Sequence, residues 1–218
     1  MNTEDILNTI HRIYENNTDY PEVDSDDFTL RLGLVNDSIK AWESVENVKW
    51  RELFATKTGN IVTLPLDVPA DFVDISSFLQ IGSDYYSYEK NDNVMAVQRQ
   101  NPSKKFFYIT GSPGAYKINI NPAPSSGTYS YSYYKKASKM INGESVPELS
   151  KPMYIVYWVL ARLYEADGRN DMVSFYEQKA NDMLAEMIAL NESPPFNNEF
   201  KITDDDIAYK LDRISFGL

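Results

Sequence analysis

The sequence predicts an α+β protein, a mainly helical bundle with an inserted antiparallel β region and an extended C-terminal tail. Apolar residues recur with the helical period before residue 59 and after residue 140, and they alternate with period 2 in between. Two adjacent prolines at 194 and 195 then stop the last helix. The expected parts are N-terminal helices of the bundle at 1–58, the inserted β region at 59–140, a C-terminal helical hairpin at 141–191 and a C-terminal docking tail at 192–218.

Two amphipathic helices are expected in the N-terminal part. The first covers residues 3–14, with Thr3 as its N-cap and isoleucines on one face. The second covers residues 26–46, because its apolar residues recur at helical spacing. Gly33 interrupts this second helix at a cost of about 1 kcal/mol relative to alanine, so we expect it to mark a close helix contact. The apolar stripe of the second helix is Phe28, Leu32, Val35, Ile39 and Trp42.

Strand patterns fill the middle of the chain. Residues 60–90 favour strands that are broken at Pro65 and Pro69, because proline cannot donate a hydrogen bond to a sheet. A hairpin is predicted where "FFYIT" and "AYKINI" flank the turn at 111–114. Residues 127–136 alternate tyrosine with serine, which is typical of a strand with one buried face.

The strongest pattern is the helical hairpin near the C-terminus. Its first helix, at 149–167, is apolar almost all round and ends at a glycine, and its second, at 171–190, is apolar on one stripe only. A helix that is apolar on every side is a central helix. We therefore expect the first helix to be covered by the second and by the helix at 26–46. The shared helical phase predicts that Tyr157 and Trp158 are buried and that Trp42 faces them.

The composition excludes several classes of function. The chain has no cysteine, so a disulfide, a thiolate nucleophile and a cysteine-bound metal are impossible. Its formal net charge of −11 disfavours general binding of nucleic acid, which needs basic patches. No run of about 18 apolar residues is present, so we expect no membrane span. The first ten residues lack the pattern of a secretory signal.

Few side chains could carry chemistry. His11 is the only histidine, and its place on an amphipathic helix favours a plain surface or boundary role over that of a general base. Asp204, Asp205 and Asp206 point in different directions on a regular backbone, which favours a solvated acidic run over a metal site. The glycine-containing turn at 111–114 lacks the lysine of a phosphate loop. We therefore predict no catalytic residue, no cofactor and no bound metal, and hence no enzyme.

Four stretches together resemble the head–tail connector adaptors of tailed bacteriophages, which are also called head-completion or tail-tubular adaptor proteins. They are "LVNDSIKAWESVENVKWREL", "GNIVTLPLDVPADFVDISSF", "KININPAPSSGTYSYSYYKKASKM" and the helical hairpin that begins "YIVYWVLARLYEADG". The resemblance covers most of residues 30–190 and rests on patterns of residue class. It implies a helical bundle with a β insertion that assembles as a ring under the portal protein, and no catalysis.

The resemblance also implies partners and a location. The expected partners are the portal protein, neighbouring tail or ring proteins, and copies of the same chain in a ring that is typically twelve-fold. DNA would pass through the ring without sequence-specific binding, and no membrane would be involved. A negative channel would repel phosphate, which fits the net charge. We expect the protein in the virion, at the head–tail junction, after synthesis in the bacterial host cytoplasm.

The last part of the chain is expected to dock on the portal or on a neighbouring subunit. The double proline projects it away from the last helix, and it holds too many apolar residues for a free arm. Such segments order on a partner, by adding a strand or by laying a short helix in a groove. The docking candidates are Phe196, Phe200, Ile202, Ile207, Tyr209, Leu211, Ile214 and Phe216.

Another class of function stays open on the sequence alone. The tyrosines of "YSYSYY" could form a platform for sugar rings, which would make the chain a carbohydrate- or receptor-binding β module of a virion or cell surface. The strongest core signal lies in the helices, whereas a lectin would place it in the sheet. The structural adaptor is therefore the preferred prediction.

Overall fold

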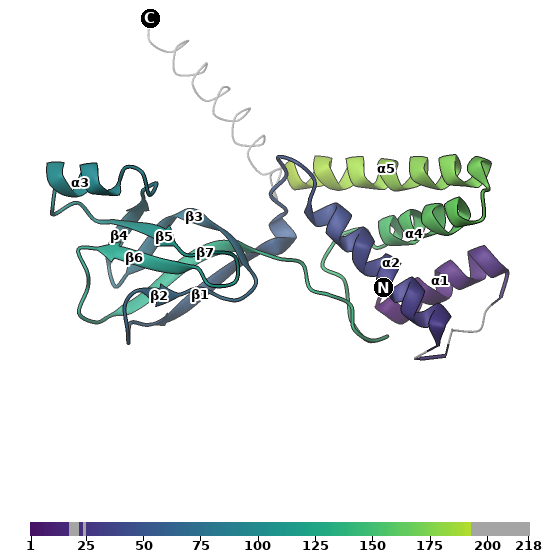
Figure 1. The fold of residues 1–218 in the computed structure, drawn as a ribbon, viewed down its shortest axis with the longest axis horizontal. Coiled ribbons are helices and arrows are strands. Elements are labelled where there is room, and N and C mark those ends of the chain that lie inside the picture. The colour runs from purple at the N-terminus through teal and green to yellow at the C-terminus, as the bar shows by residue number, and fades with distance from the viewer. Residues whose placement is uncertain (18–21, 24, 193–218) are drawn as a thin grey trace, which may run out of the picture.

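Four long helices lie on one side of the molecule, and the sheet lies on the other together with one short helix, in an elongated arrangement (Figure 1). The structure is a computed structural model, and it describes residues 1–17, 22–23 and 25–192. The predicted mainly helical bundle is wrong, because the fold is a mixed one with a curled half-barrel sheet, and 42% of the described residues are helical and 22% lie in strands. The strands hold an aromatic core of their own, separate from the core of the helices. Because of this second core, the sheet is stabilised by buried residues of its own and is not a small insertion in a helical bundle.

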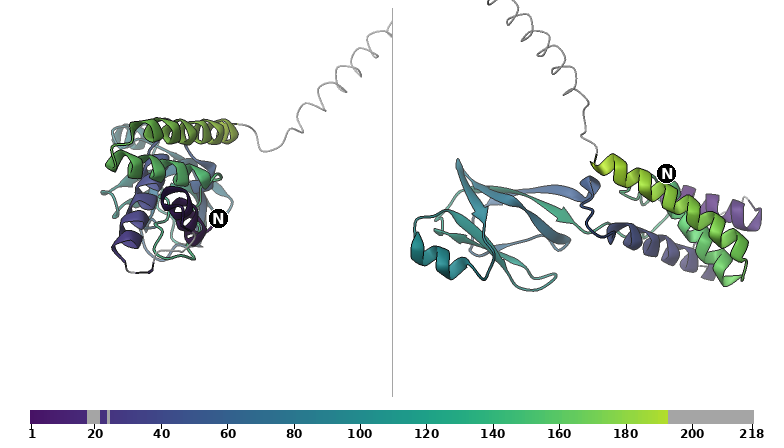
Figure 2. Two further views of the ribbon diagram at one scale, coloured as in Figure 1. Left: turned by 90° about the vertical axis from the view of Figure 1, so that its right-hand side faces the viewer. Right: turned by 90° about the horizontal axis from the view of Figure 1, so that it is seen from above.

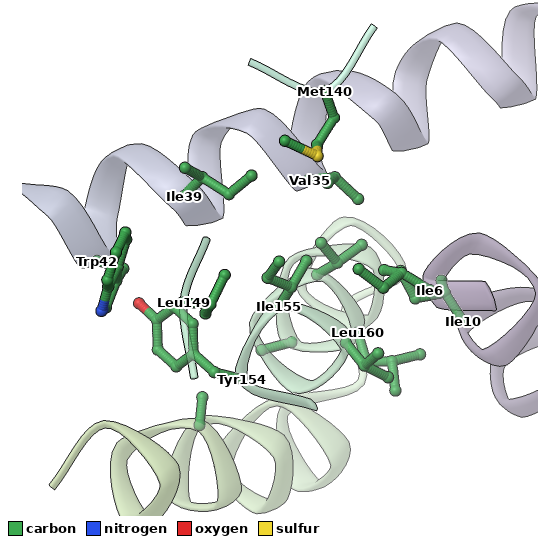
Figure 3. Packing of buried hydrophobic residues seen from close by; sticks show 14 of the residues in the cluster. Ile6, Ile10, Val35, Ile39, Trp42, Met140, Leu149, Tyr154, Ile155 and Leu160 are labelled. Atoms are coloured by element: carbon green, nitrogen blue, oxygen red, sulfur yellow. The ribbon is translucent and has the colours of Figure 1, made fainter. Parts of the chain in front are cut away.

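Four long helices form the helical side. They are α1 (Thr3–Glu15), α2 (Asp26–Glu43), α4 (Met153–Ala166) and α5 (Asn170–Glu192). Helix α4 packs against the other three, which confirms its predicted central place. Its residues Ile155, Val156, Val159 and Leu160 are fully buried. Figure 3 shows side chains of α1 and α2 converging on this helix.

The start of α1 is fixed one residue earlier than the sequence pattern suggested. Asn2, and not Thr3, is the N-cap: its side-chain oxygen accepts a hydrogen bond from the Asp5 N–H at 2.8 Å. The Asp5 carboxylate accepts one from the Asn2 N–H at 3.1 Å, which completes a capping box. Thr3 is fully buried and donates its hydroxyl hydrogen to the Ser145 carbonyl at 2.8 Å. Thr3 therefore ties α1 to the segment that leads into α4.

The tryptophans are arranged differently from the prediction. Trp42 is fully buried, but its ring faces that of Trp50, whose centroid lies 5.0 Å away. Figure 3 shows Tyr154 of α4 on the side of Trp42. Tyr157 and Trp158 are only half-buried, so their predicted burial opposite Trp42 is wrong. Each residue along a helix turns by about 100°, and it is the Tyr154 side of α4 that faces α2.

The β region forms one sheet with the order β1-β7-β3-β4-β5-β6-β2. The predicted wholly antiparallel pairing is wrong at one place, because β4 and β5 are parallel. Parallel neighbours need a crossover connection, and helix α3 (Val94–Gln100) lies within it. The strands are β1 (Phe54–Asn60), β2 (Leu66–Asp67), β3 (Phe72–Ile81), β4 (Asp84–Tyr88), β5 (Phe106–Thr110), β6 (Lys117–Asn121) and β7 (Thr128–Lys135).

Turn residues follow the predictions more closely. Strands β5 and β6 pair antiparallel with Thr110 opposite Lys117, which confirms the hairpin. Gly111 in its turn has a φ of +104°, and a Cβ atom there would lie 2.4 Å from the Ala115 carbonyl oxygen. Pro65 and Pro69 lie on either side of β2, in the connections where strand breakers were expected. A short 3-10 helix, η1 (Arg51–Leu53), leads into β1 and thus joins the helical side to the sheet.

Candidate interaction site at the junction of helices and sheet

His11 belongs to a buried polar cluster between α1 and α2. Its side chain was expected at a surface or boundary, yet the residue is only 7% exposed. Arg31 of α2 is 3% exposed, contacts the Nδ1 atom of His11 and forms an ion pair with Glu15. Burial lowers the pKa of Arg31. No sequence pattern indicated the role of Arg31, because an arginine beside an apolar stripe is usually solvated.

The other two candidate sites from the sequence, the turn at 111–114 and the acidic run at 204–206, do not form a site in the described residues. The turn at 111–114 closes the β5–β6 hairpin. In the ranges 1–17, 22–23 and 25–192, no group of three or more His, Cys, Asp or Glu side chains could hold a metal ion. Asp204, Asp205 and Asp206 lie outside these ranges.

Three of the four tyrosines of β7 point into the core of the sheet. Tyr129, Tyr131 and Tyr133 are each at most 8% exposed, and the rings of the first two stack with centroids 6.0 Å apart. Burial raises the pKa of Tyr131, since the charged phenolate would lose its hydration. Buried rings cannot offer their faces to a sugar, and the fourth tyrosine, Tyr134, is a single half-buried ring, so the strand does not present a row of rings to a sugar.

A groove of about 650 Å³ lies where the helical side meets the sheet. Its apolar wall includes Val48 after α2, Leu53 of η1, and Val73 and Tyr134 of the sheet. Val73 is 49% exposed because a register shift between Phe72 and Asp74 leaves it as an extra residue opposite β7. We call this surface the junction groove. No sequence pattern identified it, because its walls come from segments far apart in the chain.

Two ion pairs brace the junction groove. Lys49 bonds the Asp74 carboxylate at 2.6 Å, and its Nζ atom lies 5.2 Å from the centroid of the Tyr134 ring. The hydrogen bond to Asp74 raises the pKa of Lys49. On the other rim, Lys135 at the end of β7 pairs with Glu148 before α4, and this bond raises the pKa of Lys135. The two pairs link helical segments to strands on either side of the groove.

The end of α5 is anchored beside the same groove. The Asn191 side-chain oxygen accepts a hydrogen bond from the Arg51 N–H at 2.9 Å, and its amide nitrogen donates one to the Lys49 carbonyl at 3.1 Å. Lys49 itself lines the junction groove. The chain that follows Glu192 therefore starts at the edge of this groove. Figure 2 shows α5 running along the helical side towards the sheet.

Comparison with known proteins decides the family. The model of the SU10 adaptor protein family matches residues 1–198. The chain belongs to the SU10 adaptor protein family. This is a family of bacteriophage adaptors, so the resemblance to phage adaptors is confirmed at that level. A comparison with curated proteins gave no match.

Membership of the SU10 adaptor family gives the general role. The chain is a bacteriophage structural adaptor, a component of the virion that associates with other head or tail proteins. A structural rather than a catalytic role agrees with this membership. None of the helices in the described part of the chain has the length and hydropathy of a membrane-spanning segment.

The negative charge of this SU10 adaptor family member resides in its helical segments. Residues 54–135, which contain all strands of the described part of the chain, carry seven Lys and Arg against six Asp and Glu. Residues 1–53 and 136–192 together carry 11 Lys and Arg against 21 Asp and Glu. The helical side is thus acidic and the sheet close to neutral.

The predicted docking residues of the tail lie beyond the last described residue, Glu192. They are Phe196, Phe200, Ile202, Ile207, Tyr209, Leu211, Ile214 and Phe216. Their role as docking residues stays a prediction.

Proposed function

We propose that this chain forms a ring that joins the portal to the tail of the virion and lets DNA pass. The match of residues 1–198 to the SU10 adaptor family is the observation that carries this proposal. The twelve-fold ring and the place at the head–tail junction are taken from the resemblance to connector adaptors.

In this proposal the sheet faces a neighbouring ring component. Phe78 and Tyr85 are 60% and 63% exposed and lie on the same face of the β3–β4 pair. Leu79 and Tyr86 lie on the opposite, buried face. Exposed aromatic residues on a rigid sheet are typical of surfaces that bind another protein.

The C-terminal segment after Glu192 is the proposed contact with the portal. Its eight apolar residues are interspersed with charges, which suits a segment that orders on a partner. The acidic helical side supports a channel through which DNA slides, because negative charge repels phosphate.

Co-expression with the portal protein of the same phage tests the proposal. The expected product is a complex in which single-particle images show a ring of this chain stacked on the portal ring. A chain that ends at Glu192 keeps the Asn191 contacts and is expected to stay folded, with helical circular dichroism and a cooperative melt, but to lose the portal. Co-purification of the shortened chain in normal yield would assign portal binding to another surface.

The carbohydrate-binding alternative receives no support from the sheet. Three of the four tyrosine rings that suggested it are buried in the core. A glycan array gives the direct measurement, and the expected result is no binding above that of an unrelated acidic protein.

A further inference from the structure

The junction groove is an apolar recess that the described residues leave uncovered. Val73 is half-exposed at its wall, and Phe54 is 46% exposed beside it, with its ring centroid 5.2 Å from that of Tyr134. Clustered apolar and aromatic side chains at a recess mark a binding site for an apolar group. The question is which group the groove binds.

The chain itself supplies a candidate at the groove edge. Asn191 is hydrogen-bonded to the backbone of Lys49 and Arg51, so the remaining chain starts within the junction. Phe196 follows Glu192 by four residues, and four extended residues span about 13 Å. A groove whose wall includes Lys49 is within that reach.

We propose that the junction groove binds the C-terminal segment of the same chain, with Phe196 seated against Val48, Val73 and Tyr134. A short tether gives Phe196 an effective concentration in the millimolar range at the groove. A second copy of the chain or a free partner would need a concentration above this value to compete for the groove at equal affinity. The prolines at 194 and 195 stiffen the tether and reduce the entropy lost on docking. This inference concerns the free chain, goes beyond the proposed function and does not depend on it.

Engineered disulfides in the full-length chain test the docking. Because the natural chain has no cysteine, Val73→Cys with Asn197→Cys gives a single possible pair and leaves Phe196 intact. Val62→Cys with Asn197→Cys is the matched control, because Val62 is 87% exposed and lies at the other end of β1 from the junction. Under mild oxidant at low protein concentration, we expect the Val73 pair to close at least ~10-fold faster than the control. Non-reducing gels and peptide mass mapping give the rates.

Adding Phe196→Ser to the Val73 pair keeps the short tether but removes the docking ring, so we expect closure to slow by at least ~5-fold. An unchanged closure rate would overturn the proposal. A Val48→Cys variant with Asn197→Cys probes the opposite wall and replaces the first pair if Val73→Cys lowers the melting temperature. Equal closure rates for the groove pairs and the Val62 pair would overturn the proposal. Cross-linked dimers whose yield rises with protein concentration would also overturn it, because a second copy would then be the occupant. Portal binding is measured separately, so the failure of either proposal leaves the other intact.

Discussion

Some aromatic side chains of this protein are buried and stabilise the fold, whereas others are exposed and available to partners. Tyr129, Tyr131 and Tyr133 are buried in one row along β7, as the alternation of tyrosine with serine predicted for one face of that strand. Phe78 and Tyr85 are exposed within equally apolar stretches. Residue type alone does not decide between these outcomes, because tyrosine suits both a core and an interface.

Trp42 and Trp158 are expected to differ in their contribution to stability. Trp42→Ala removes a fully buried ring that packs on Trp50, so the free energy of unfolding should fall by about 3–5 kcal/mol. Trp158→Ala removes a half-buried ring covered by Arg162 and should lower it by only about 1–2 kcal/mol. Urea denaturation followed by far-UV circular dichroism measures both. Equal losses would contradict the arrangement of α2 and α4.

Glu148 is expected to stabilise the fold in a pH-dependent way. Burial by itself raises its pKa, but hydrogen bonds from Lys135 and Ser138 outweigh it and hold the pKa below the usual 4.5. A lowered folded-state pKa gives stability that is present above about pH 4.5 and lost as the pH falls through the folded value. Glu148→Gln should lower the free energy of unfolding by about 1–2 kcal/mol at neutral pH.

The difference between Glu148→Gln and the parent should narrow as the pH falls below about 4. Glu144→Gln is the matched control, because Glu144 is exposed on the same segment. A difference that stays constant across the acid range would show that the charge of Glu148 is not the cause.

Two glycines occupy different positions relative to helices: Gly168 follows the end of α4, and Gly33 lies within α2. Gly168 follows α4 with a φ of +71°, and the Arg169 N–H after it bonds the Tyr164 carbonyl at 3.0 Å. This left-handed position is where the chain reverses into α5, as its predicted place after the helix indicated. Gly33 within α2 was expected at a close helix contact, but a Cβ atom there would have no neighbour within 4 Å. That expectation is wrong.

Alanine at these two glycines is expected to have opposite effects. Gly168→Ala forces a Cβ atom into the left-handed region and should lower the free energy of unfolding by about 1–2 kcal/mol. Gly33→Ala adds helix propensity in open space and should raise it by about 0.5–1 kcal/mol. Thermal melts of the two variants beside the parent give the comparison. A stabilising Gly168→Ala would mean that the α4–α5 turn has another conformation.

At the scale of the whole molecule, two cores meet at one junction. The helical core and the sheet core share no buried residue, and ion pairs such as Lys49–Asp74 and Lys135–Glu148 connect the two sides. The two sides also differ in net charge, because the helical segments are acidic and the sheet is nearly neutral. The two sides therefore have surfaces of different chemistry, as an adaptor between different neighbours requires.

Removal of the sheet is expected to abolish assembly and to spare the helices. A chain in which a short Gly-Ser linker replaces residues 54–135 retains α1, α2, α4 and α5 with their core. We expect helical circular dichroism with a cooperative melt, and no ring on the portal. Phe78→Ser with Tyr85→Ser in the full chain is the milder companion variant. Normal assembly of both would exclude the sheet from the ring contacts.

The sequence by itself determined the elements with local signals. The central helix α4, the β5–β6 hairpin, the breakers Pro65 and Pro69 and the turn after α4 follow from periodicity and turn residues within a few positions of each other. The quoted stretches also identified the chain as a phage adaptor, which the family match confirms at that level.

Only the tertiary structure decided which segments meet. The order of the strands, the parallel β4–β5 pair, the side of α4 that faces Trp42 and the walls of the junction groove all join residues far apart in the chain. Periodicity reports that a segment has a face to bury, but it carries no information about the partner that covers it. That choice is made by the packing of all faces at once, which is why the fold proved to be a mixed one with two cores and not a mainly helical bundle.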